Sequence, residues 1–348
     1  MDRSFKLNTH LLKKRVPNLT VAAKNEGLRP ATVSNLTTGK IPIGRAEVRT
    51  LVALSKIADC TLDELLIFED ETEKIETGIK TIDLFAPFVR GGTAGLVAQP
   101  GMGQLVLLAE LFYRMRRLNF YTILFMPNEA IQGIDDATSN ADCFCSNVDD
   151  ILRQIETVNA EQDILIGVDR SILLSGDLNE FKERMNNEVD DPITYLIVDT
   201  TGQAVDDDSL YGPLESLWSF DMDLATRNMF PAINPVNSTS TLLENEYLEA
   251  SHVNSIRAAK KLLRRYRELA FLVDRFGETK LADRDRVTYH RGLRLEAFFT
   301  QPFYITEPFT KKTGVWVSLQ DTIKDVQSIM DGKADQLAVD ELMYRGGI

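Results

Sequence analysis

The chain has 348 residues, which is more than one small domain needs and indicates two or three domains. Hydrophobic residues make up 44% and charged residues 26%, and no run of about 18 apolar residues predicts a membrane span. Residues 1–60 contain eleven Lys/Arg and four Asp/Glu, a net charge of +7, which leaves −20 for residues 61–348 of a chain whose total is −13. The acidic part would repel phosphate, so any contact with nucleic acid is confined to the basic N-terminal part.

The chain has three cysteines, too few and an uneven number for a set of disulfide bonds, which indicates a reducing compartment. The first residues lack the apolar stretch of a secretory signal, so we expect a cytoplasmic protein with no membrane partner. Cys143 and Cys145 form a CxC pair, which we interpret as two small apolar residues. A metal or redox site is the alternative, and we predict no metal centre there.

Five short helices are predicted in the N-terminal part. Pro30 suits the first turn of the third helix, and Thr61 and Glu64 form a capping box that begins the fifth. The pattern predicts an all-α bundle over residues 1–67, followed by an acidic linker over residues 68–74. The first four predicted helices cover residues 6–15, 20–26, 30–37 and 45–58.

Short apolar runs alternate with predicted helices beyond the linker. This alternation is typical of an α/β domain with a buried parallel sheet, which we place over residues 75–240. From residue 241 the sequence becomes helical and highly charged, which predicts a C-terminal α-helical domain over residues 241–348. The four predicted strands include residues 95–98, 121–125, 164–168 and 195–198.

The second and third helices have the spacing of a DNA-binding motif. Ala23 lies on the second helix, Gly27 in the turn, and Val33 and Leu36 on the buried side of the third helix. This spacing resembles the helix-turn-helix of the Cro and phage-repressor family, also called the XRE family, in which the third helix lies in the major groove. The residues that the resemblance places towards DNA are Arg29, Pro30, Ala31, Thr32, Ser34, Asn35, Thr38 and Lys40.

The resemblance also implies a role for several of these residues. Arg29 suits guanine and Asn35 suits adenine, each through two hydrogen bonds. Thr32, Thr38 and Lys40 suit phosphate contacts that fix register. Family members usually bind as dimers, which implies double-stranded operator DNA and a homo-oligomer of two or more copies. A helical bundle used only for protein contacts is the alternative.

Residues 75–348 resemble the catalytic β subunit of the rotary ATP synthase. The resemblance implies a P-loop, RecA-like α/β domain followed by a helical domain, with the helix-turn-helix in place of the family's N-terminal β-barrel. The matching segments are collinear and include residues 75–88, 91–92, 230–235, 238–240, 299–303, 307–310, 331–333 and 344–348.

The phosphate-binding loop departs from the family pattern G-x-x-x-x-G-K-[ST]. Gln104 replaces the lysine that neutralises the phosphates, and Leu105 replaces the hydroxyl residue that ligates Mg²⁺. Pro100 removes a further backbone N–H donor. The residues of this degenerate loop are Ala98, Gly101, Met102, Gly103, Gln104 and Leu105.

Of the remaining catalytic positions, two keep the residue of the family and two do not. Glu129 aligns with the family glutamate that activates water, and Asp199 with the Walker-B aspartate. Ala130 and Gln203 replace two arginines of the family. Losing a lysine and two arginines removes most of the electrostatic stabilisation of phosphoryl transfer. The resemblance therefore implies a pseudo-ATPase in which Glu129 and Asp199 are vestigial.

Three aromatic residues, Phe230, Phe303 and Phe309, fall at the family's adenine-pocket positions. Stacking does not require the missing lysine, so weak binding of ATP, ADP or another planar ligand stays open. The alternative is that these rings are plain core, and no other cofactor is predicted.

Together these features predict a bacterial DNA-binding transcriptional regulator, acting as a repressor. Its β-like body would serve oligomerisation or the sensing of a small ligand or a protein partner. Two other functions stay open, namely a divergent ATPase acting on DNA and an interaction protein that mimics the β subunit.

Overall fold

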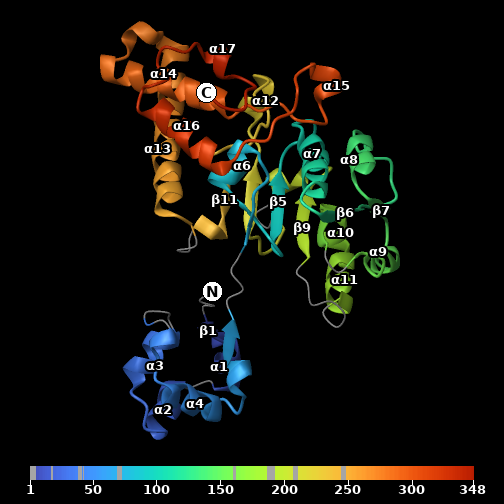
Figure 1. Cartoon of the computed structure of the whole chain (residues 1–348), viewed down its shortest axis with the longest axis vertical. Coiled ribbons are helices and arrows are strands. Elements are labelled where there is room, and N and C mark those ends of the chain that lie inside the picture. The colour runs from blue at the N-terminus through green and yellow to red at the C-terminus, as the bar shows by residue number, and fades with distance from the viewer. Residues whose placement is uncertain are drawn as a thin grey trace. The chain divides into compact units, whose positions relative to one another are not determined.

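The computed structural model describes residues 5–16, 19–37, 41, 43–68, 73–159, 162–185, 193–206, 211–243 and 248–348. The chain forms two compact units, Met1–Glu73 and Lys74–Ile348, which we call the head and the body (Figure 1). The boundary between them falls inside the predicted linker, of which residues 69–72 lie outside the described residues.

The head is mainly helical, as predicted. Its core is formed by buried side chains from every α-helix, including Leu12, Ala23, Val33, Leu54 and Leu65. The predicted capping box is present, since Thr61 Oγ1 accepts the Glu64 N–H at 3.2 Å and Glu64 Oε2 accepts the Thr61 N–H at 2.9 Å. The elements are β1 (Phe5–Leu7), α1 (Thr9–Arg15), α2 (Leu19–Asn25), α3 (Pro30–Thr37), a 3₁₀ turn (Ile43–Arg45), α4 (Val48–Ile57), α5 (Leu62–Leu65) and β2 (Leu66–Phe68).

The prediction of an all-α head is wrong in one respect. Strand β1 pairs with β2 in an antiparallel ribbon that sets Phe5 opposite Phe68 and Leu7 opposite Leu66. Helix α1 therefore begins at Thr9 and not at residue 6. The reason is that Asn8 caps the helix, since its Oδ1 accepts the Leu11 N–H at 3.0 Å, and this leaves residues 5–7 extended and free to pair.

The body is built on a seven-stranded sheet with the order β11-β10-β5-β9-β8-β6-β7. All neighbouring pairs are parallel except β10 with β11, as expected of an α/β domain. The four predicted strands are confirmed, with bounds that shift by one or two residues. The strands are β5 (Thr93–Val97), β6 (Phe120–Phe125), β7 (Cys143–Cys145), β8 (Asp163–Asp169), β9 (Thr194–Val198), β10 (Ser216–Ser219) and β11 (Thr239–Ser240), and β3 (Lys74–Ile75) pairs separately with β4 (Phe88–Val89).

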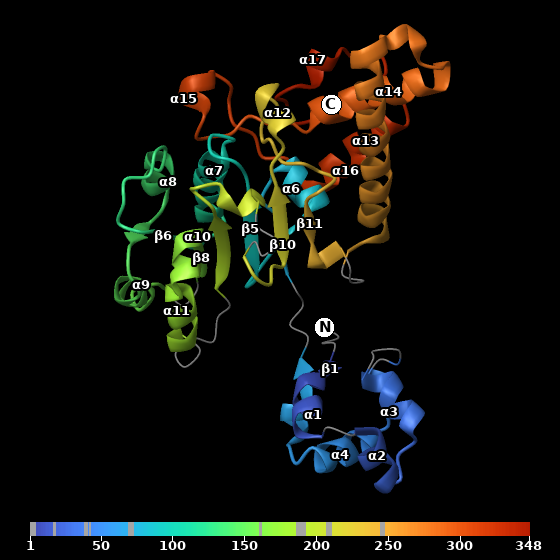
Figure 2. The same cartoon turned by 180° about the vertical axis from the view of Figure 1, so that it is seen from behind.

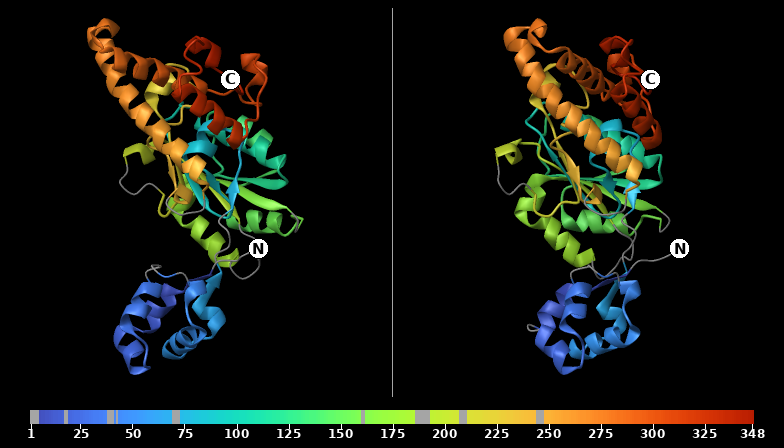
Figure 3. Two further views of the ribbon diagram at one scale, coloured as in Figure 1. Left: turned by 60° about the vertical axis from the view of Figure 1, so that its left-hand side comes forward. Right: turned by 90° about the vertical axis from the view of Figure 1, so that its left-hand side faces the viewer.

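Helices flank this sheet (Figures 1 and 2). The long helix α13 packs beside α14 and α16 along one side of the body (Figure 3). In the described residues no helix is both long and apolar enough to cross a membrane. The helices are α6 (Lys80–Phe85), α7 (Gln104–Arg116), α8 (Asp135–Asn140), α9 (Val148–Ile155), α10 (Arg170–Ser175), α11 (Asp177–Met185), α12 (Met222–Thr226), α13 (Ala250–Phe276), α14 (Asp283–Phe298), α15 (Glu307–Thr310), α16 (Leu319–Met330) and α17 (Val339–Leu342).

The predicted division at residue 240 is not a boundary between compact units, because residues 74–348 form one unit. Buried polar side chains join its early and late parts. Lys80 on α6 is fully buried, and its Nζ donates hydrogen bonds to the carbonyl oxygens of Thr300 at 3.0 Å and Arg345 at 2.8 Å.

A second contact between the early and late parts of the body involves the ion pair of Glu110 and Arg114 on α7. Both side chains are fully buried, with 2.7 Å between Glu110 Oε1 and Arg114 Nε. The guanidinium of Arg114 also donates to the carbonyl oxygens of Gly78 at 2.9 Å and Val315 at 2.8 Å. Glu110 Oε2 accepts the backbone N–H of Ile305 at 3.1 Å. The C-terminal segment is thus held on α7 by groups whose hydrogen bonds are satisfied inside the body.

Candidate functional site

The first candidate site is the face of α3 in the head. The turn before α3 contains Gly27 at φ +75°, a conformation that favours glycine, and the Leu28 N–H donates to the Ala23 carbonyl oxygen at 2.8 Å. Val33 and Leu36 are buried, as predicted. Arg29, Pro30, Ala31 and Ser34 are exposed, Thr32 and Asn35 are half-buried, and Thr38 and Lys40 lie outside the described residues.

A hollow of about 600 Å³ lies beside α3, between this helix and the start of α4. Three arginines line it, Arg29, Arg45 and Arg49, together with Glu26 and Glu47. Arg49 forms an ion pair with Glu47. Arg45 and Arg49 were not among the predicted DNA-facing residues, although both contribute to the basic charge that the sequence shows. The fold therefore adds Arg45, and Arg49 together with its partner Glu47, to the face that carries Arg29.

The second candidate site is the loop that connects β5 to α7, where the resemblance predicts a degenerate phosphate loop. Met102 is buried, and its Sδ accepts the N–H of Gln99 at 3.2 Å, so one N–H donor of the loop is used within the loop. Gln104 is buried, and Leu105 packs against the main core of the body. Pro100 is packed closely, with its Cγ 2.9 Å from where a Cβ on Gly202 would lie.

Asp199 follows β9, and its carboxylate accepts hydrogen bonds from the turn that comes directly after it. Its Oδ1 accepts hydrogen bonds from the N–H and the hydroxyl of Thr201 at 2.9 and 2.7 Å, and its Oδ2 accepts the Ala204 N–H at 2.5 Å. Arg170 Nη1 lies 4.0 Å from Oδ2. Burial would raise the pKa of Asp199, but the hydrogen bonds from Thr201, Ala204 and Gly202 hold this pKa below its ordinary value. The carboxylate is ionised and holds the turn that follows the strand.

Glu129 and Gln203 are exposed, Glu129 in a bend after β6 and Gln203 at the start of a 3₁₀ helix (Gln203–Asp206). Glu129 donates its N–H to the Pro127 carbonyl oxygen at 2.8 Å. In the described part of the chain, no hydrogen bond or ion pair joins Glu129, Asp199 and Gln104.

The third candidate site is a cavity of about 530 Å³, which we call the aromatic cavity. Two of the three predicted aromatic residues, Phe230 and Phe303, line it. The ring of Phe230 comes within 3.6 Å of where a Cβ on Gly103 would lie, so the degenerate loop borders this cavity. The lining residues are Gly101, Gly103, Val106, Leu107, Phe220, Asn228, Phe230, Pro231, Ala232, Gln301, Pro302, Phe303, Thr306, Thr310, Lys312 and Tyr344.

Phe309 does not line the cavity, which corrects the prediction for this residue. Its side chain is 77% exposed. The reason is the geometry of α15, because Thr306 and Thr310, four residues apart on one side of the turn, face the cavity. The intervening Phe309 is directed elsewhere. Phe303 is buried in the main core cluster and Phe230 packs against a second cluster, so both rings line the cavity while they also pack in the core.

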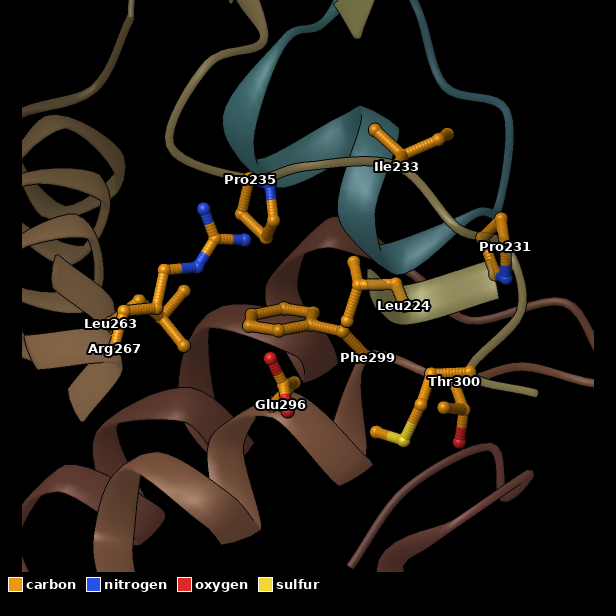
Figure 4. A pocket seen from close by; sticks show the side chains of 10 residues that line it. Leu224, Pro231, Ile233, Pro235, Leu263, Arg267, Glu296, Phe299 and Thr300 are labelled. Carbon is orange, nitrogen blue, oxygen red and sulfur yellow. The ribbon is translucent and has the colours of Figure 1, made fainter. Parts of the chain in front are cut away.

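A much smaller void of about 20 Å³ shares Pro231 with the aromatic cavity (Figure 4). Side chains from residues 224–235, from α13 and from α14 surround it, including Arg267 and Glu296. This void has room for little more than one water molecule. Glu296 accepts hydrogen bonds from Arg227 Nη1 at 2.7 Å and from the Tyr266 hydroxyl at 3.1 Å, so its role is structural.

The CxC pair lies on β7, the strand at one edge of the sheet. The side-chain hydrogen bond with Cys145 lowers the pKa of the Cys143 thiol against the opposing effect of burial. Within the described residues, no group of three His, Cys, Asp or Glu side chains is arranged to hold a metal ion.

Comparison with known proteins supports the fold of the body. No protein-family model matches the chain. The chain is similar to a solved structure described as a unique ATP synthase subunit, NeqB, from Nanoarcheaum equitans. The TM-score is 0.57 at 18% sequence identity, and the similarity covers 76% of this chain and 79% of that one. At this identity the similarity establishes a shared fold and no shared activity.

Proposed function

We propose that the chain is a DNA-binding transcriptional regulator that acts as a repressor. Helices α2 and α3 would serve as a Cro-type helix-turn-helix, and the ATP-synthase-like body would not hydrolyse ATP. The observation that carries the proposal is the position of α3, with Ser34 exposed and Thr32 and Asn35 half-buried, in the one basic part of an acidic chain. Arg29 and Arg45 lie beside this helix. Arginines beside a reading helix supply phosphate contacts, and the helix itself supplies base contacts.

A mobility-shift assay on the DNA upstream of the protein's own coding sequence tests this proposal. We expect a specific shift whose affinity falls steeply with salt. Asn35→Ala or Arg29→Ala should weaken specific binding about 10–100-fold, because each removes two hydrogen bonds to a base. Arg45→Ala should weaken binding to all sequences and lower the salt slope by about 1.

The control for these variants is Lys56→Ala. Lys56 is an exposed cation on α4 that does not line the hollow beside α3, so its removal changes the net charge equally. We expect it to leave the specific shift almost unchanged. Absence of any shift at low salt, or equal losses for Arg45→Ala and Lys56→Ala, would count against the proposal.

The body supports a second prediction, that purified protein does not turn over ATP. A neutral Gln104 stands at the lysine position, Met102 accepts a loop N–H, and Asp199 is held by its own turn. Phosphate release from wild type and from Glu129→Gln should therefore be equal and at background level. Release that exceeds background and falls in Glu129→Gln would favour the alternative of a divergent ATPase.

Self-association of the body would complete this function. The β subunits that the body resembles pack side by side in rings, and joining several heads raises their combined affinity for repeated sites. The oligomeric mass measured with and without operator DNA tests this part. A monomer in both conditions would contradict it.

A further inference from the structure

We infer that the aromatic cavity binds a flat aromatic molecule with a single carboxylate and rejects nucleoside triphosphates. This inference adds a ligand site to the proposed regulator, and it does not depend on DNA binding. It departs from the resemblance to the β subunit, because the residues around the cavity fit an aromatic ring but do not fit a chain of phosphates.

The walls of the cavity suit a flat apolar molecule. Its volume of about 530 Å³ is that of an ordinary small-molecule pocket. Val106 and Leu107 of α7 lie on one wall, and Phe230 and Phe303 offer aromatic rings. Gly103 has no side chain and φ +93°, so the backbone of the loop borders the cavity directly. Aromatic rings that border open space favour stacking with a planar ligand.

The hydroxyl and glutamine donors around the cavity are already used inside the chain. The amide nitrogen of Gln301 donates to the Gly78 and Val315 carbonyl oxygens at 2.7 and 2.9 Å. The hydroxyls of Thr306 and Thr310 donate to carbonyl oxygens at 3.0 Å each. The Tyr344 hydroxyl donates to the Asn228 carbonyl oxygen. These groups therefore have no donor left for a polyphosphate.

Lys312 is the one cation among the described residues that line the cavity. Its Nζ lies 4.2 Å from the centre of the Tyr344 ring, and in the described part of the chain it donates no hydrogen bond. The side chain is exposed, so it can turn towards a ligand at the rim. With the neutral Gln104 in the loop, one lysine balances one negative charge, which is the charge of a carboxylate and not of a triphosphate.

Two probes with similar ring systems test the inference. We expect 1-naphthoate to bind the full chain saturably with one site per chain in isothermal titration calorimetry, and 1-naphthalenemethanol to bind the same site without the charge. Lys312→Gln should weaken naphthoate about 2–5-fold, as expected of an exposed ion pair, and leave naphthalenemethanol unchanged. Lys311→Gln is the matched control, because Lys311 Nζ donates to the Pro308 carbonyl oxygen at 2.8 Å and does not line the cavity.

Filling the cavity tests where the probes bind. Val106→Trp should weaken both probes at least about 10-fold, with folding checked by thermal unfolding. If this variant fails to fold, Phe230→Leu replaces a flat ring with a non-planar apolar side chain, and both probes should bind about 3–10-fold more weakly. ATP at millimolar concentration should not displace naphthoate.

Four results would overturn the inference. They are no naphthoate binding to wild type, displacement of naphthoate by ATP, equal effects of Lys312→Gln and Lys311→Gln, and unchanged binding in the cavity variants. Because the titrations contain no DNA, a failed mobility shift leaves this result standing. Conversely, a failed titration leaves the proposed DNA binding standing.

Discussion

Arg114→Met is expected to lower the free energy of unfolding of the body by about 3–5 kcal/mol. The substitution removes the cation but leaves the Glu110 carboxylate fully buried next to an apolar side chain. It also leaves the Thr77, Gly78 and Val315 carbonyl oxygens without the N–H groups that Arg114 donates to them. A buried charge that loses its partner costs far more than the pair itself contributes.

Chemical unfolding followed by tryptophan fluorescence measures this loss. Both tryptophans, Trp218 and Trp316, belong to the body, so the signal does not report the head. The control is Arg153→Met, which breaks an exposed pair with Asp150 and should cost less than about 1 kcal/mol. Equal losses for Arg114→Met and Arg153→Met would contradict the role given to the buried pair.

Gly78→Ala is expected to lower the same free energy by about 2–5 kcal/mol. Gly78 has φ +68°, a conformation that is strained for alanine. A Cβ at this position would lie 2.6 Å from Cε2 of Trp316, so the ring would have to move. Gly78 also donates its N–H to Asp83 Oδ2 at 2.7 Å and accepts hydrogen bonds from Arg114 and Gln301, so a backbone shift is opposed from several sides.

The control separates backbone strain from steric overlap. Gly176 has φ +93°, and a Cβ there would meet no atom within 4 Å. Gly176→Ala should therefore cost about 1–2 kcal/mol, from strain alone. If the two substitutions lower the free energy of unfolding equally, the overlap with Trp316 contributes nothing. That result would contradict close packing around Gly78.

Much of the fold could be predicted because local chemistry determines it. The capping box of Thr61 and Glu64 begins a helix where the sequence places it, since both partners lie within one turn. The buried strands were recognised because uninterrupted apolar runs between polar segments are typical of a sheet covered on both faces. Gly27 has the positive φ expected of the turn before α3.

Features that depend on distant partners could not be predicted. Strand β1 has three residues, and its pairing with β2 joins positions about sixty residues apart, so no local pattern indicates it. Glu110 and Arg114 have the spacing of an exposed helical pair, and only the tertiary fold shows that both are buried. Short strands such as β7 and β11 have too few residues to show the alternation of apolar and polar side chains that marks a strand.

In the candidate sites too, local features could be predicted from the sequence and features that depend on distant contacts could not. The loop substitutions at Gln104 and Leu105 are visible in the sequence, whereas the contact of Met102 with the Gln99 N–H is not. Phe230 and Phe303 line the aromatic cavity, whereas the direction of Phe309 depends on the turn of a four-residue helix. The place of Lys312 at the cavity depends on the hydrogen bonds of Glu110 and Arg114 of α7 with Ile305 and Val315 on either side of it, which leave no local pattern in the sequence.

The pairing of β1 with β2 has a consequence for protein engineering. Phe5 at the start of β1 and Phe68 at the end of β2 are opposite each other in the ribbon, so the outer ends of these two strands are adjacent. A segment with adjacent ends can be inserted into a surface loop of an unrelated host without stretching either partner. We therefore expect that the head can be inserted into a host protein as a unit, provided that Leu66–Phe68 is kept as the strand that pairs with β1.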